Sequence, residues 1–187
     1  IILQAKCRNC KTNIAFRYFL VELLTALCFL GIFYLYGVTI TTLMLIILSI
    51  FFVIIFFIDL DHFIIPNELT FPLMIIGFLK SFDPNINLDL FPSYMESLIG
   101  GVLGYILIWS IITLYMKIRK KEGMGLGDAK LLAAIGFWFG WYSIPYVIFL
   151  SSLSALLIAL PSLINKSKSM SSQIPFGPYL IFGTVAY

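Results

Sequence analysis

Three carboxylates are the residues of this chain whose positions suggest chemistry. Asp59 and Asp61 follow the uninterrupted apolar run 50–58, and Asp128 follows the glycine-rich run 123–127. The other six acids fall in predicted loops or near predicted helix ends, where a negative charge is ordinary: Glu22, Glu68, Asp83, Asp89, Glu96 and Glu122. An acid beside a long apolar run is costly without a partner or a function, so the first three are the candidate functional residues.

Two carboxylates that meet can carry out amide hydrolysis. At about 4 Å and an effective dielectric of about 20, two negative charges repel by about 4 kcal/mol, so one acid stays protonated while the other is ionised. The ionised acid takes a proton from a water molecule that attacks an amide, and the protonated acid donates to the carbonyl oxygen. This chemistry is aspartyl proteolysis, and it requires no cofactor.

Simpler interpretations of the same acids remain open. Asp128 would also serve as the N-cap of a helix that begins there, and Asp59 would also fit a solvated acid at a membrane boundary. Residues two positions apart on a helix differ by about 200°, so only one of Asp59 and Asp61 can face Asp128. We expect that residue to be Asp59, because it directly continues the apolar helix.

The neighbours of Asp128 suggest how it is positioned. Gly125 and Gly127 are expected to allow a backbone bend that turns Asp128 toward Asp59. Lys130 lies about 200° around a helix from Asp128, so we expect it to anchor to lipid headgroups or to the substrate.

The composition indicates which solvent surrounds the elements that carry these residues. Of the 187 residues, 61% are hydrophobic and 11% are charged, against roughly 45–50% and about 25% in soluble domains. Lipid must therefore be the solvent for most of the chain, and we predict an all-α, polytopic transmembrane helical bundle with six or seven spans. The predicted spans are Tyr18–Tyr36, Thr41–Ile58, Asn67–Leu79, Met95–Met116, Asp128–Gly140, Ser143–Ile164 and a last one from Pro175 onward. The third and fifth are short, so they must sit within a bundle or extend into neighbouring loops.

The basic residues between the spans predict the orientation. Basic clusters precede the first, fifth and last spans, whereas the loop 80–94 is acidic. Because basic loops are retained in the cytoplasm, the loop 117–127 is predicted to be cytoplasmic and the loop 80–94 external. Counting spans from a cytoplasmic amino end then places all three candidate acids at the cytoplasmic face. The formal net charge of +3 is too small and too scattered to indicate binding of nucleic acid.

Three motifs, taken together and in order, resemble a known family. They are FIDLDHFIIPN at 57–67, GMGLGDAKL at 123–131 and IPFGP at 174–178. These motifs resemble those of the bacterial prepilin peptidases, or type IV leader peptidases, which are GxGD-type intramembrane aspartyl proteases. The resemblance implies that Asp59 and Asp128 are the catalytic pair, since the family's first acid stands seven residues before a proline.

The same resemblance implies a substrate, a location and further site residues. It implies an endopeptidase of the bacterial cytoplasmic (inner) membrane that removes leader peptides from type IV prepilins, pseudopilins or competence pilins at the cytoplasmic face. The expected partners are these leader peptides and the lipid bilayer, with no nucleic acid. Residues of the matched motifs that we expect to shape the site are Gly125, Gly127, Lys130 and Pro66.

The amino-terminal segment is interpreted separately. Residues 1–17 resemble part of the family's cytoplasmic region, and residues 18–187 resemble its transmembrane peptidase domain, which we expect to be truncated at its carboxyl end. Cys7 and Cys10 form one C-x-x-C, which is half of a four-cysteine zinc site. By the resemblance, full-length members also methylate the new amino terminus with S-adenosylmethionine through this region. Zinc and S-adenosylmethionine are therefore expected only in a full-length form, and the half motif argues against methylation by this chain.

Two other classes of function are alternatives. A proton-coupled membrane transporter would also carry acids in its helices, but its acids are expected at the midplane, and no inverted repeat is visible in the sequence. In a non-catalytic membrane assembly subunit the acids would be incidental. His62 would suit a proton shuttle beside the acids, but we interpret it as a loop histidine.

Overall fold

Seven α-helices make up most of the part of the chain that the structure describes. The computed structural model describes residues 15–83, 90–120, 125–164 and 175–187, and there is no strand within these ranges. The helices are α1 (Phe16–Tyr36), α2 (Ile40–His62), α3 (Asn67–Leu79), α4 (Tyr94–Arg119), α5 (Leu126–Phe139), α6 (Ser143–Ile164) and α7 (Gly177–Val185), with a short 3-10 helix, η1 (Lys80–Phe82), directly after α3. The predicted all-α class is confirmed.

The helix ends lie close to those predicted from the apolar runs, with one difference that matters for the site. In lipid a segment must satisfy its own backbone N–H and C=O groups, so each long apolar run becomes a helix. The helix α2 continues to His62, four residues beyond the predicted end at Ile58. It ends where Phe63 takes a left-handed backbone with φ 56°, and the Phe63 N–H donates to the Asp59 carbonyl oxygen at 2.9 Å. Asp59 is therefore a helical residue and not part of the following turn.

Four of the described helices are long and apolar enough to cross a membrane, namely α1, α2, α4 and α6. The other three have 13, 14 and 9 residues. At about 1.5 Å per residue they are shorter than a hydrocarbon core of roughly 30 Å. All of the predicted spans are thus helices, but only four of them have the length and composition of a full span.

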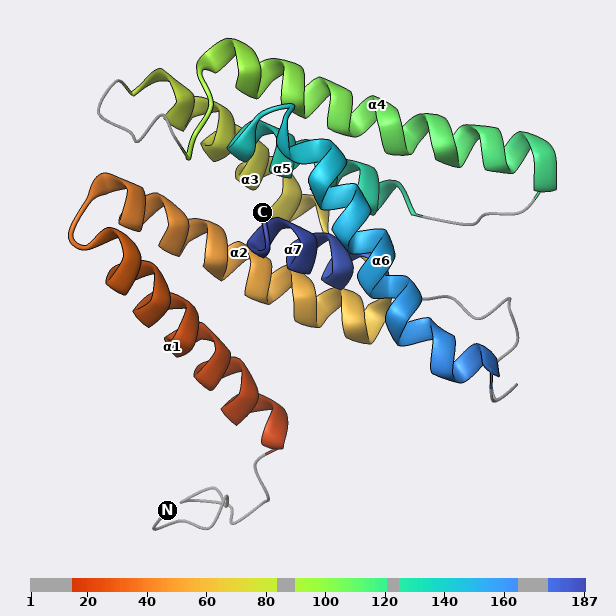
Figure 1. Cartoon of the computed structure of the whole chain (residues 1–187), viewed down its shortest axis with the longest axis horizontal. Helices are drawn as coiled ribbons and strands as arrows, with labels where there is room; N and C mark the ends of the chain where they lie inside the picture. Colours follow the sequence, from red (N-terminus) through yellow and green to blue (C-terminus); the bar gives the residue numbers. More distant parts are fainter. Residues whose placement is uncertain (1–14, 84–89, 121–124, 165–174) are drawn as a thin grey trace. The chain divides into compact units, whose positions relative to one another are not determined.

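The chain divides into two compact units, residues 1–53 and 54–187. In the first unit, α1 leads into α2 through a turn at Gly37, whose φ is 61° and whose carbonyl oxygen accepts a hydrogen bond from the Thr42 hydroxyl at 2.7 Å. The second unit contains the end of α2 and all later helices. Within it, α5 contacts α3, α4, α6 and α7, and α6 and α7 lie side by side (Figure 1). Most of α5 is buried, so α5 is the central helix of the second unit.

Glycines bring α4 and α5 close together. A Cβ on Gly104 of α4 would lie 2.7 Å from the Leu132 carbonyl oxygen of α5. A Cβ on Gly100 or on Gly136 would strike the backbone of the opposite helix. Lipid provides little hydrophobic drive for helix association, so membrane helices associate through close contacts of this kind between small residues.

Side chains from neighbouring elements cap the carboxyl end of α5. The last carbonyl groups of a helix have no partner inside it. The Ser97 hydroxyl donates to the Phe137 carbonyl oxygen at 2.7 Å, and the Lys80 ammonium donates to the Trp138 carbonyl oxygen at 2.8 Å. Lys80 is 5% exposed, and this burial lowers the pKa of Lys80 to about 7.

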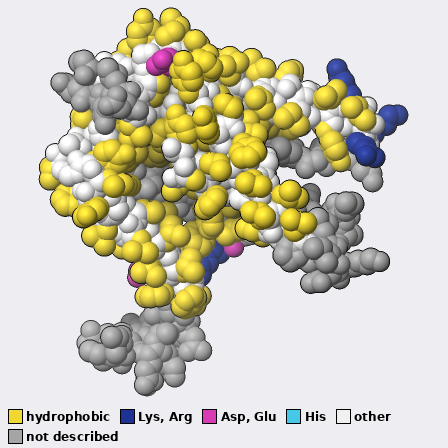
Figure 2. All heavy atoms as spheres, viewed as in Figure 1, with side chains coloured by type: hydrophobic (Ala, Val, Ile, Leu, Met, Phe, Trp, Pro, Cys, Tyr) yellow, Lys and Arg dark blue, Asp and Glu magenta, His cyan; other side chains and the backbone are white. Residues whose placement is uncertain are grey.

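Hydrophobic side chains cover most of the face seen in Figure 2, as a surface in contact with lipid requires. Lys and Arg side chains gather where α4 ends (Figure 2), and the described residues there are Lys117, Arg119 and Lys120. This basic end is typical of a helix end that stays in water beside the lipid headgroups.

Candidate functional site

Asp59 lies in the last turn of α2 and is buried, with 4% of the residue exposed. Its Oδ2 accepts a hydrogen bond from the Gly177 backbone N–H at 3.0 Å. Gly177 is the first residue of α7, and the N–H groups of a first helical turn have no partner inside their helix. Asp61 is exposed on the same helix, so the angle of about 200° between the two acids directs only Asp59 to the interior.

Asp128 occupies the first turn of α5 and is also buried, with 8% of the residue exposed. The N-cap of α5 is Gly125, so the interpretation of Asp128 as the N-cap is wrong. The glycine that precedes Asp128 and the glycine that donates to Asp59 both lie against the side chain of Ile65, so the two acids border the same side chain. The end of α2 and the start of α5 thus bring two buried carboxylates to one place. Ionising both acids at once is costly there, because little water screens the two charges.

Close approach explains two glycines of the site. A Cβ on Gly127 would lie 2.9 Å from the Cβ of Ile65, and a Cβ on Gly177 would lie 2.7 Å from Oδ2 of Asp59. Neither glycine has a positive φ. Gly125 has an extended backbone, with φ −80° and ψ 150°, which any residue can adopt. The expected bend before Asp128 therefore does not depend on the flexibility of glycine, and Gly127 serves the contact with Ile65 instead.

Lys130 is held by a neighbouring helix. Its ammonium donates to Oδ1 of Asn67 at 2.6 Å and lies 5.6 Å from the ring centre of Phe71. Asn67 is the first residue of α3 and follows Pro66, which is the N-cap of that helix. In the structure Lys130 therefore joins the start of α5 to the start of α3. The sequence had instead suggested lipid headgroups or the substrate as its partner.

Two further candidates from the sequence are the cysteine pair and His62. Cys7 and Cys10 lie outside the described residues, so the zinc half-site stays a prediction. His62 is the last residue of α2 and is exposed.

Neither Ile65 nor Gly177 was singled out from the sequence, although both lie in the matched motifs. The signal for Gly177 was its position directly before Pro178, since proline is favoured in the first turn of a helix. Ile65 carried no comparable local signal, because its contacts come from segments far away in the sequence.

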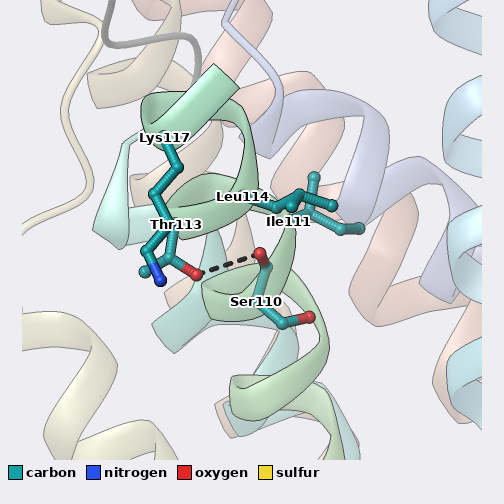
Figure 3. Close-up of a pocket in the computed structure, with 5 residues that line it drawn as sticks. All are labelled: Ser110, Ile111, Thr113, Leu114 and Lys117. Carbon is teal, nitrogen blue, oxygen red and sulfur yellow. Dashed lines mark hydrogen bonds between the residues drawn. The ribbon is translucent and has the colours of Figure 1, made fainter. Parts of the chain in front are cut away.

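The hollow drawn in Figure 3 is separate from these residues. It has a volume of about 320 Å³, and the side chains that line it all belong to α4: Ser110, Ile111, Thr113, Leu114 and Lys117. The Thr113 hydroxyl donates to the Ser110 carbonyl oxygen at 3.0 Å beside it (Figure 3). Since none of the candidate acids lines this hollow, it is not part of the site.

The fold and the site together define a helical membrane protein with two neighbouring, buried carboxylates at helix ends. Such a pair can hold one shared proton and exchange protons with water and a polar substrate group. The chain belongs to the type IV leader peptidase family, which matches residues 46–160. Residues 1–36 also match the bacterial peptidase A24 N-terminal domain.

Several relatives are similar to the chain over nearly its whole length. The prepilin leader peptidase/N-methyltransferase of Aeromonas hydrophila is 40% identical over 185 residues, which is 98% of this chain and 62% of that protein. The protein of the same name from Pseudomonas aeruginosa is 37% identical over 187 residues, which is 100% of this chain and 63% of that protein. The chain therefore spans about three fifths of the length of these relatives. No solved structure matches the chain.

Proposed function

We propose that this protein is a membrane-embedded aspartyl endopeptidase that removes leader peptides from type IV prepilins, pseudopilins or competence pilins. The observation that carries the proposal is that two buried carboxylates, Asp59 at the end of α2 and Asp128 at the start of α5, border the same side chain, Ile65, through Gly177 and Gly127. Membership of a leader peptidase family and the names of the relatives support the substrate class.

In the proposed reaction one acid is ionised and the other is protonated. The ionised acid takes a proton from water, the water oxygen bonds to the scissile carbonyl carbon, and the second acid gives its proton to the carbonyl oxygen. The tetrahedral intermediate then collapses: the C–N bond breaks, the leaving nitrogen takes up the proton held by the pair, and one hydroxyl group of the intermediate returns its proton to the pair. The products are a carboxylic acid and an amine, and the reaction needs no metal or other cofactor. The Gly177 N–H keeps Asp59 in place during these steps.

The active site is proposed to face the cytoplasm from the inner membrane. Asp128 follows the basic end of α4 closely in the sequence. The exposed basic residues at that end are Lys117, Arg119 and Lys120. Positive charge beside a membrane helix favours the cytoplasmic side. Leader peptides of newly made prepilins would meet the pair on that side.

Purified protein incubated in detergent with a synthetic peptide that spans a prepilin leader junction tests the proposal. We expect mass spectrometry to detect the released leader with the wild type. Asp59→Asn and Asp128→Asn should each lower the rate by about 10²–10⁴-fold or more, because an amide can neither ionise nor hold the shared proton. Asp61→Asn is the matched control on the same helix and should keep substantial activity.

Two outcomes would contradict the proposal at different levels. A wild type that releases no leader would overturn the function. An inactive Asp61→Asn beside an active Asp59→Asn would overturn the choice of acid. A proton-coupled transporter would instead move protons across vesicles without cleaving the peptide, but its acids are expected near the midplane, whereas Asp59 and Asp128 are expected at a membrane boundary.

For the full-length protein we also propose methylation of the new amino terminus by S-adenosylmethionine. The match of residues 1–36 to the peptidase A24 N-terminal domain and the names of the relatives support this activity. Cys7 and Cys10 would supply two ligands of a four-cysteine zinc site there. Transfer of a labelled methyl group to the cleaved peptide tests it.

A further inference from the structure

One side chain contacts the surroundings of both acids. Ile65 lies in the turn between α2 and α3. A Cβ on Gly127 would lie 2.9 Å from the Cβ of Ile65 and 3.4 Å from its Cγ1, and a Cβ on Gly177 would lie 3.1 Å from its Cδ1. The two ends of the Ile65 side chain therefore contact two different glycines.

Each of these glycines is linked to one member of the acid pair, either through the chain or through a hydrogen bond. Gly127 directly precedes Asp128 in α5. Gly177 donates its N–H to Oδ2 of Asp59 at 3.0 Å. A shift of Ile65 would consequently be passed to Asp128 through the chain and to Asp59 through this hydrogen bond.

We propose that Ile65 is a positioning residue that sets the separation between the carboxyl groups of Asp59 and Asp128. The inference rests on the proposed peptidase function, because it concerns how that pair is aligned for catalysis. Ile65 itself donates and accepts no proton, and it acts through Gly127 and Gly177.

The surroundings of Ile65 make it suitable as a rigid spacer. Isoleucine is branched at Cβ and has few side-chain rotamers. Pro66 follows it and restricts its backbone to extended conformations. One residue further on, Asn67 accepts the hydrogen bond from Lys130 at 2.6 Å. Lys130 lies three residues after Gly127 and so on the same face of α5, which means that the turn is attached to α5 at two points on one face.

Replacing Ile65 tests whether the spacer matters for catalysis and not only for folding. Ile65→Ala should lower kcat by about 10²-fold with little change in KM, because a displacement of about 1 Å between reacting groups costs that much. Ile64→Ala is the matched control, since Ile64 is the preceding residue, is 60% exposed and makes neither glycine contact. It should keep the wild-type kcat. The amount of folded protein and the melting temperature are measured for both variants.

A double substitution tests the contact itself. Gly177→Ala should lower kcat, because its new methyl group would press on Cδ1 of Ile65 and on Oδ2 of Asp59. Ile65→Val removes Cδ1 and keeps the Cβ that faces Gly127. The combination Ile65→Val with Gly177→Ala should therefore recover the part of the kcat loss in Gly177→Ala that comes from pressure on Cδ1, while the contact with Oδ2 of Asp59 at 2.7 Å remains.

The outcomes separate this inference from the proposed function. A wild type that releases no leader overturns both. A wild type that cleaves while Ile65→Ala keeps its kcat overturns the role of Ile65 and leaves the peptidase intact. The inference would also be overturned if the losses of kcat in the two single variants simply added in the double variant. A change in KM with no change in kcat for Ile65→Ala would likewise show that Ile65 does not set the geometry of the acids.

Discussion

Asp59 and Asp61 stand two positions apart on α2, and their surroundings give them different chemistry. Asp59 is buried and accepts the Gly177 N–H, whereas Asp61 is exposed. A carboxylate removed from water is destabilised unless hydrogen bonds replace those of the solvent. The start of α7 provides such a bond, because its first N–H has no partner inside the helix. The two buried acids are therefore positioned by three helix ends and not by one motif.

Gly127→Val tests the close contact beside Asp128. The added side chain would overlap Ile65, so we expect it to reduce leader cleavage much more than it reduces the amount of folded protein in the membrane. Gly125→Ala is the comparison two residues earlier, where the nearest atom to a Cβ would be 3.8 Å away. It should lower cleavage far less. Normal cleavage by Gly127→Val would show that this contact serves packing only.

At the scale of elements, α5 connects the site to the rest of the second unit. Its first turn carries Asp128, its middle lies against the glycines of α4, and its last carbonyl groups are capped by Ser97 and Lys80. Because the helix has only 14 residues and most of them are buried, its neighbours hold it along its whole length. Substitutions that weaken the contact of α5 with α4, or its cap of Ser97 and Lys80, should therefore lower the stability more than the rate of cleavage.

Gly104→Ala tests the packing of α4 on α5. Its methyl group would lie 2.7 Å from the Leu132 carbonyl oxygen. Because that oxygen belongs to the backbone of α5, it can give way only if the two helices move apart. We expect a loss of about 1–3 kcal/mol in stability, seen as a melting temperature lower by roughly 2–4 °C per kcal/mol. Gly31→Ala on α1 is the control, because a Cβ there would meet no atom within 4 Å beyond the neighbouring backbone of its own helix. Equal melting temperatures for both variants would contradict the close packing.

Lys80 predicts a pH dependence of stability. Burial lowers the pKa of Lys80 to about 7, whereas a lysine in an unfolded chain has a pKa of about 10.4. Between these values the unfolded chain binds more protons, so this residue makes stability rise with pH, by at most about 1.4 kcal/mol per pH unit. The wild type should therefore gain in melting temperature relative to Lys80→Met from pH 7 to pH 9. A constant difference between the two proteins would show that Lys80 does not titrate in this range.

At the scale of the whole molecule, the distribution of charge predicts the orientation in the membrane. The exposed basic residues at the end of α4 are Lys117, Arg119 and Lys120. Positive charges of this kind are retained in the cytoplasm. The candidate acids would then lie on the side where newly made substrates arrive.

Cysteine labelling in intact cells tests this orientation. In a background without the native cysteines, Asn85→Cys should react with a membrane-impermeant reagent from outside, and Lys120→Cys should react only after the cells are opened. The reverse pattern would place the acids on the outer face and remove the proposed access of substrate from the cytoplasm.

The sequence alone predicted the helices, and it drew attention to two acids that are buried in the structure, Asp59 and Asp128. Long apolar runs in lipid have no alternative to helix, so composition and run length were sufficient to locate α1 to α7 within a few residues of their ends. Charge is rare in this chain, so acids beside long apolar runs were conspicuous. The family was visible because two of its three motifs contain these acids.

The tertiary structure alone decided how the site is assembled. The bond from Gly177 to Asp59 joins residues 118 positions apart, and the bond from Lys130 to Asn67 joins residues 63 positions apart. Ile65 likewise meets Gly127 and Gly177 only because three helix ends converge. In a water-soluble protein the polar face of a helix would show which side packs inward. Helices that are apolar on every side carry no such pattern, so side-chain fit between neighbouring helices decides the packing, and local sequence does not reveal it.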